Sequence, residues 1–68
     1  MNRDQFLRKL KKYCRKNGLT YEWEPGEGKG SHGAAYVAGR RTIVQSGELQ
    51  NYLVDDILDY FQIPRGSL

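Results

Sequence analysis

The stretch AAYVAGRRTIVQ, residues 34–45, decides the fold that this sequence predicts. Its two halves, 34–38 and 41–45, are rich in β-branched, aromatic and small apolar residues, which indicates strands. Gly39-Arg40 lies between them and predicts a tight reversal of the chain. Strands joined by so short a turn pair antiparallel, so we expect a β-hairpin in the middle of the fold.

A third strand is predicted on the N-terminal side of this hairpin. Residues 19–24, LTYEWE, alternate apolar and polar side chains, and Pro25 ends the alternation. Tyr21, Trp23 and Tyr36 have rings suited either to stacking on bases or to packing in a core. Because they alternate with polar residues, we predict that all three pack in the core.

Amphipathic helices are predicted on both sides of the strands. In the first, the apolar residues fall on one helical stripe at Phe6, Leu7, Leu10, Tyr13 and Cys14. Asn2 and Gln5 have the spacing of a capping box, and Gly18 is placed to end this helix in the left-handed conformation. We expect Cys14 to be a core residue. The second helix is predicted to begin near Asn51, with an acidic polar face.

The order of elements is therefore helix, strand, strand, strand, helix. It predicts an α+β fold, a two-layer sandwich in which a three-stranded antiparallel sheet carries both helices on one face. Residues 1–63 are expected to form a single domain. Residues 64–68 show no periodicity, and we expect a tail that is either disordered or left over from cloning.

The net charge of the 68 residues is only +3, but it is unevenly distributed. Residues 1–17 hold seven basic residues and one acidic residue, whereas residues 48–61 hold four acidic residues and no basic one. A basic surface favours a polyanionic partner, and the acidic end would repel one. We therefore expect a bound nucleic acid to lie along one face only.

The cysteine and histidine content of the chain excludes a zinc site built from these residues and an internal disulfide. One cysteine and one histidine cannot supply the ligands of a Cys/His zinc site, and a single cysteine forms no internal disulfide. We expect no metal, no cofactor and a reducing, cytoplasmic setting. The chain opens on a charged amphipathic pattern rather than an apolar signal region, and no apolar run approaches the ~20 residues needed to cross a bilayer, so no membrane association is expected.

The single histidine, His32, follows a segment with glycines at positions 26, 28 and 30. Imidazole takes and gives a proton near neutral pH, which makes His32 a candidate acid–base catalyst; the alternative is a loop residue without a function. Lys29 is suited to neutralising a phosphate, with the backbone N–H groups of Gly30 and Ser31 as an anion-binding nest, or simply to solvation.

Three other interpretations of this segment are not supported by the sequence. We expect Ser31 to shape the turn or orient the histidine rather than act as a nucleophile, because no Asp or second base lies nearby to complete a triad. The segment also lacks a contiguous Gly-Lys-Ser/Thr between a strand and a helix, and its glycines miss the dinucleotide-binding spacing. Both nucleotide motifs are therefore rejected.

Together these features resemble the HicA family of mRNA interferase toxins from bacterial toxin–antitoxin systems. The resemblance covers nearly the whole chain, up to Ile63. It rests on the αβββα order, on Lys-Gly-Ser-His at 29–32, on the aromatic Tyr36, on the basic stretch 40–44 and on the apolar pattern of the last helix. Family members often carry a second histidine or an aromatic residue where this chain has Gly33.

The resemblance implies a double-stranded-RNA-binding-like fold and ribosome-independent cleavage of mRNA. It also implies that His32 is the catalytic residue and that a HicB-type antitoxin covers the active site. RNA cleavage through the 2′-hydroxyl needs no metal, and one imidazole fills only one of the two proton-transfer roles. A positioned acid–base group of this kind raises the reaction rate by about 10²–10⁴-fold.

Folds of this kind contact RNA phosphates and 2′-hydroxyls by shape. Six basic residues are therefore candidate RNA-backbone anchors: Arg8, Lys12, Arg15, Lys16, Arg40 and Arg41. The alternative for the helical ones is a solvated helix surface. We expect no DNA binding by the chain itself.

Two other functions remain open at this point. The first is a non-catalytic module that binds structured RNA through the same basic face. The second is a small protein-interaction domain that docks a partner on its sheet edge or its acidic second helix.

Overall fold

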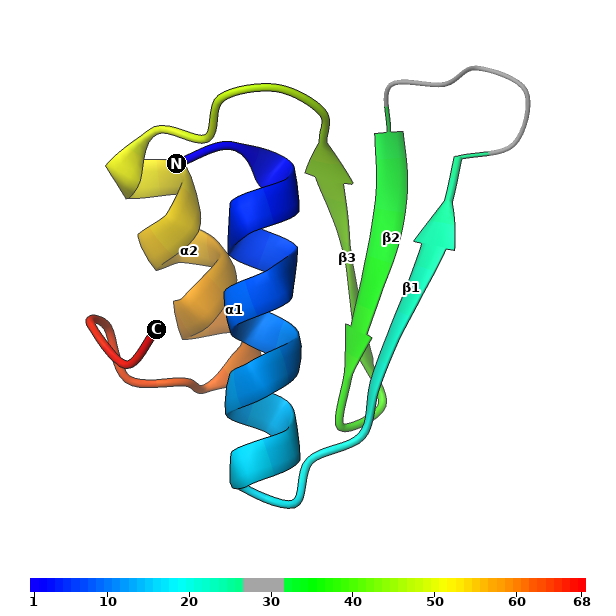
Figure 1. Cartoon of the computed structure of the whole chain (residues 1–68), viewed down its shortest axis with the longest axis vertical. Coiled ribbons are helices and arrows are strands. Elements are labelled where there is room, and N and C mark those ends of the chain that lie inside the picture. The colour runs from blue at the N-terminus through cyan, green and yellow to red at the C-terminus, as the bar shows by residue number, and fades with distance from the viewer. Residues whose placement is uncertain (27–31) are drawn as a thin grey trace.

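The computed structural model describes residues 1–26 and 32–68 and has the predicted α+β fold (Figure 1). Its five elements follow the order αβββα: α1 Arg3–Lys16, β1 Tyr21–Pro25, β2 His32–Val37, β3 Arg40–Gln45 and α2 Asn51–Phe61. The strands form one antiparallel sheet in the order β1-β2-β3. Figure 1 shows both helices on the same side of this sheet, which leaves its other face uncovered by helices.

Helix α1 begins and ends where the sequence predicts. The backbone N–H of Gln5 donates to the Asn2 side chain over 2.8 Å, and the Gln5 side chain accepts from the Asn2 N–H over 3.0 Å, so the capping box is confirmed. At the other end Gly18 has a φ of 70°, and the N–H of Leu19 donates to the carbonyl of Cys14 over 2.8 Å. This closure satisfies carbonyls that the last helical turn leaves unpaired.

The hairpin turn lies one residue earlier than predicted. Val37 pairs with Arg40, so the reversal is at Ala38-Gly39 rather than at Gly39-Arg40. Both turn residues have positive φ, 51° for Ala38 and 84° for Gly39. A two-residue turn with these dihedrals matches the right-handed twist of the strands, and this match determines the position of the turn. The cost is an alanine in a left-handed conformation that L-residues with a Cβ disfavour.

Replacing this alanine is therefore expected to stabilise the fold. Ala38→Asn introduces the Asn-Gly pair that such turns prefer, because asparagine tolerates positive φ better than alanine. We expect a gain of about 0.5–1 kcal/mol in the free energy of unfolding, measured by urea denaturation. Ala38→Val is the control, since a β-branched residue at this φ lowers stability. Equal stability of the three proteins would contradict the turn assignment.

The core lies between the helices and the sheet. Its fully buried side chains come from α1, the sheet and α2, with Phe6, Leu10, Cys14, Val37, Val44 and Leu58 as the largest. The prediction for Cys14 is confirmed, and burial raises the pKa of its thiol. Tyr21 and Trp23 are partly buried and pack against this core, as predicted. The pKa of Tyr21 is raised by burial and, secondarily, by Cys14.

The last residues fold back against the helical layer. Helix α2 ends at Gln62 in the left-handed conformation, and Ile63 behind it is buried. The Arg65 guanidinium then binds the carboxylate of Asp59 through two contacts, Nε–Oδ1 at 3.2 Å and Nη2–Oδ2 at 2.7 Å. Leu68 packs against the core. The tail is therefore tied to α2 by a bidentate ion pair.

This ion pair makes a pH-dependent prediction. The hydrogen bond from Arg65 holds the pKa of Asp59 below its usual range, so Arg65→Gln is expected to raise it. Because the folded-state pKa is the lower one, the pair stabilises the fold above the unfolded-state pKa of Asp59, and this contribution is lost as the pH falls through the folded-state pKa. The variant is therefore less stable than the wild type near neutral pH and equally stable in strong acid.

The pKa of Asp59 is measured by carbon-detected NMR titration of its carboxyl group, and stability by thermal melting at both pH values. Arg65→Lys is the matched control, because it keeps the charge without the bidentate geometry and is expected to retain part of the shift. An unchanged pKa for Asp59 in Arg65→Gln would show that the tail does not make this contact.

Candidate functional site

His32 is the first residue of β2 and is exposed. Side chains alternate along a strand, and Ala35 and Val37 of β2 are buried in the core with Gly33 in the same phase. His32 therefore shares the opposite face with Ala34 and Tyr36. The candidate imidazole lies on the face of the sheet that the helices leave uncovered.

Three pairs of residues on β2 and β3 line this uncovered face, and we call them the open face. From the β2 start to the hairpin they are His32 with Gln45, Ala34 with Ile43, and Tyr36 with Arg41. Successive pairs lie about 7 Å apart, since each strand residue advances by 3.2–3.4 Å. Ile43 is 47% exposed and lies in the middle pair. The open face thus carries an imidazole at one end, an apolar pair in the middle and a cation at the other end.

Tyr36 links three strands across the open face. Its hydroxyl donates to Glu24 Oε1 on β1 over 3.3 Å and accepts from Arg41 Nε on β3 over 3.2 Å. The Arg41 guanidinium carbon also lies 6.0 Å from the centre of the Tyr36 ring. The prediction that Tyr36 packs in the core is therefore wrong. Ala35 and Val37 take the buried phase of β2, which turns Tyr36 outward.

Glu24 is a residue that the sequence argument did not include in the site. It pairs with Ala34 on the open face and is thus a diagonal neighbour of His32. Diagonal neighbours on one face of an antiparallel pair lie about 7–8 Å apart. Glu22 follows on the same face, opposite Tyr36. The β1 side of the open face is consequently acidic, and the β3 side carries Arg41.

The backbone that holds His32 is fixed by its neighbour. Gly33 is buried because the six-membered ring of Trp23 lies over it: a Cβ at position 33 would collide with Trp23 Cζ2 and Cη2. Arg3 of α1 packs over the same indole, with its guanidinium carbon 5.2 Å from the ring centre. The side chains of Arg3 and Trp23 therefore clamp the start of β2.

This clamp predicts a strong effect of adding one methyl group. Gly33→Ala is expected to lower the free energy of unfolding by about 1–3 kcal/mol, because the indole has to move out of a packed position. Urea denaturation measures the loss. In a Trp23→Phe background, which lacks the two ring carbons that collide, Gly33→Ala is expected to cost less, and the remaining cost comes from the Glu24 carbonyl oxygen, which lies 2.9 Å from the added Cβ. A cost independent of residue 23 would contradict the clamp.

The predicted basic anchors do not converge on His32. Arg8, Lys12, Arg15 and Lys16 are exposed on α1, in the helical layer rather than on the open face. Arg40 shares the face of Val37 and lies over α2, where its Nη1 donates to the carbonyl of Tyr60 over 3.4 Å. Of the six residues, only Arg41 is on the open face, about 13 Å along the strands from His32.

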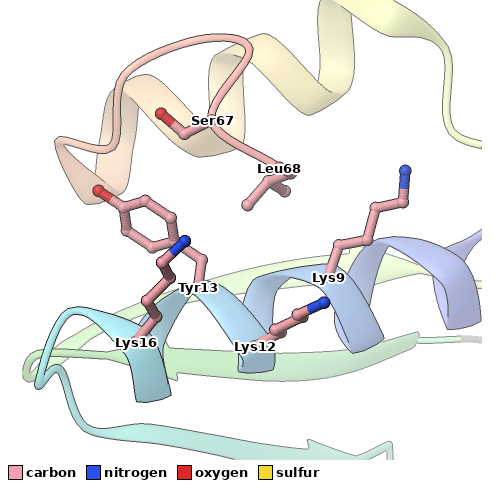
Figure 2. A pocket seen from close by; sticks show the side chains of 6 residues that line it. All are labelled: Lys9, Lys12, Tyr13, Lys16, Ser67 and Leu68. Atoms are coloured by element: carbon pink, nitrogen blue, oxygen red, sulfur yellow. The ribbon is translucent and has the colours of Figure 1, made fainter.

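The other predicted site residues cannot be placed. Lys29, Gly30 and Ser31 lie outside the described residues. Lys9, which the sequence argument did not single out, lines a pocket on α1 together with Lys12 and Lys16 (Figure 2). The sequence could have indicated Lys9, because residues 9, 12 and 16 fall on one helical face.

Within residues 1–26 and 32–68, no three side chains of His, Cys, Asp or Glu are grouped so that they could hold a metal ion. Neither helix in the described part of the chain has the length and apolar character needed to span a membrane.

Comparisons with protein-family models, with curated proteins and with solved structures give no match to this chain.

Proposed function

We propose that the chain is a ribonuclease toxin of the HicA type that cleaves mRNA independently of the ribosome, acts in the cytoplasm and is inhibited by a HicB-type antitoxin. The observation that carries the proposal is an exposed imidazole at the start of β2, on the open face of an αβββα fold. The sequence resemblance assigns the catalytic role to this same residue.

His32 acts in this proposal through proton transfer alone. As a general base it takes the proton of a 2′-hydroxyl while that oxygen attacks the adjacent phosphorus; the bond to the 5′-oxygen breaks, and the product ends in a 2′,3′-cyclic phosphate. As a general acid it protonates the departing 5′-oxygen instead. A single positioned imidazole raises the reaction rate by about 10²–10⁴-fold, so we expect a slow enzyme.

The charges around the open face indicate how the substrate approaches. Glu22 and Glu24 make the β1 side unfavourable to phosphates, while Arg41 attracts them on the β3 side. Ile43 offers an apolar surface between Arg41 and His32 on which a base can rest. We infer an RNA strand that follows β2 and β3, with Arg41 positioning a phosphate about 13 Å from the cleaved bond.

The decisive experiment compares cleavage of purified mRNA by wild-type protein and His32→Ala, with EDTA present in both reactions. We expect the variant to lose about 10²–10⁴-fold in rate, because the only imidazole in the chain is removed. Gln50→Ala is the matched control and is expected to retain most of the activity, because Gln50 is exposed outside the open face and its side chain makes no cap hydrogen bond. Equal cutting by wild type and His32→Ala would overturn the assignment.

A non-catalytic RNA-binding module is the second candidate. The observation that favours it is the distribution of positive charge, which is concentrated on α1 rather than around His32. This alternative predicts that neither wild type nor His32→Ala cuts RNA although both bind it. Charge reversals at Lys12 and Arg15 would then abolish binding.

A further inference from the structure

A pocket of about 280 Å³ lies between α1 and the folded-back tail (Figure 2). Its floor is the solvent side of α1, and its outer wall is formed by Ser67 and Leu68 of the tail. Six residues line it: Lys9, Lys12, Tyr13, Lys16, Ser67 and Leu68. In Figure 2 the lysines rise from α1 on the side away from the sheet, so the pocket and the open face are on opposite sides of the molecule.

The three lysines form a positive cluster along one face of α1. Their positions correspond to rises of about 4.5 Å and 6 Å along the helix, so the cluster spans about 10.5 Å. In the part of the chain that the structure describes, none of Lys9, Lys12 and Lys16 takes part in an ion pair or side-chain hydrogen bond. Like charges at this spacing repel one another, and an anion that contacts two or more of the lysines would relieve this repulsion.

The outer wall of the pocket is held in place before any ligand arrives. Arg65 ties the tail to α2 through Asp59, and the N–H of Ser67 donates to the carbonyl of Pro64 over 3.2 Å across a turn. Leu68 packs against the core. Ser67 and Leu68 of the tail thus lie across a preformed gap from α1, and the partly buried Tyr13 rises from α1 beside the lysines. A preformed site loses less conformational entropy when it binds.

We propose that this pocket binds consecutive phosphates of a single-stranded RNA segment, while another part of the same strand lies on the open face. The proposal rests on the proposed function for the identity of RNA as the ligand. A lone phosphate reaches only part of a cluster that spans about 10.5 Å, whereas a strand presents a phosphate at every nucleotide. Lysine binds each of them as a point charge.

The opposite placement of the two surfaces selects a single strand. A stiff duplex lies against one side of so small a domain, whose principal extents are 32 × 23 × 17 Å. A flexible single strand can pass around an edge and occupy both sides at once. The helical layer then supplies affinity, and the open face supplies the chemistry.

Binding is tested in the His32→Ala background, so that the probe stays intact. The probe is a fluorescein-labelled single-stranded RNA of about 12 nucleotides, within the usual site size of small RNA-binding folds, and the dissociation constant is measured by anisotropy at several salt concentrations. We expect Lys9→Gln/Lys12→Gln to weaken binding about tenfold or more. The slope of log K against log salt is expected to fall by about 1.4, which corresponds to two lost phosphate contacts.

Lys11→Glu is the charge-matched control. It changes the net charge by the same two units on the same helix, but Lys11 does not line the pocket. We expect it to weaken binding less than about threefold, as a diffuse field effect. Equal losses in both variants, no binding by the His32→Ala parent, or displacement of the probe by tripolyphosphate at equal phosphate concentration would each overturn the proposal.

The bridging geometry is tested by NMR on the same His32→Ala protein labelled with ¹⁵N. One equivalent of a single strand is expected to shift the amides of Tyr13 and Lys16 together with those of Tyr36 and Arg41, whereas a duplex of equal length shifts only one of the two groups. A single strand that shifts only one group would overturn the bridging. Neither measurement uses cleavage, so a failure of His32 as catalyst and a failure of the pocket give different results.

Discussion

The packing of Trp23 on Gly33 is the contact on which the site depends. It fixes the register of β2 against β1, and the register decides which face of the sheet each side chain occupies. A slip of one residue would turn His32 toward the helices and Gly33 outward. Arg3 packs over the same indole, so the N-terminal turn of α1 also contributes to this contact. The catalytic proposal therefore depends on the same contact as the stability of the sheet.

Arginine and lysine have different roles in this small domain. Four of the six arginines pack against specific groups: Arg3 on Trp23, Arg40 on Tyr60, Arg41 on Tyr36 and Arg65 on Asp59. A planar guanidinium suits such stacked and bidentate contacts. The lysines of α1 have no comparable partners in the described residues, and their charge remains available to a ligand. A count of basic residues from the sequence therefore overestimates the positive surface that is open to a polyanion, because Arg3, Arg40 and Arg65 hold parts of the fold together.

The fold was predictable because its signals are local. The capping box at Asn2, the left-handed Gly18 and the helical stripes each depend on neighbours within one or two turns, and the αβββα order follows from them. The misplaced turn and the outward Tyr36 share one cause. Pairing with two other strands decides which side chains of β2 face the core. The residues of β2 alone do not show this, because two small alanines lie on opposite faces of the strand. The separation of the basic residues from His32 is likewise a property of the packed layers.

The last helix shows how the charge asymmetry of the sequence is resolved in the fold. Helix α2 carries acidic side chains and has no basic residue in its own last turn. Its C-terminal end instead receives Arg40 from β3, which reaches the Tyr60 carbonyl, and Arg65 from the tail, which binds Asp59. Both arginines come from outside the helix, and their positive charges interact favourably with the negative end of its dipole. Arg65 fastens the tail that walls the lysine pocket, so the acidic helix also contributes to this pocket. It holds in place the segment that shapes the basic pocket on its neighbour α1.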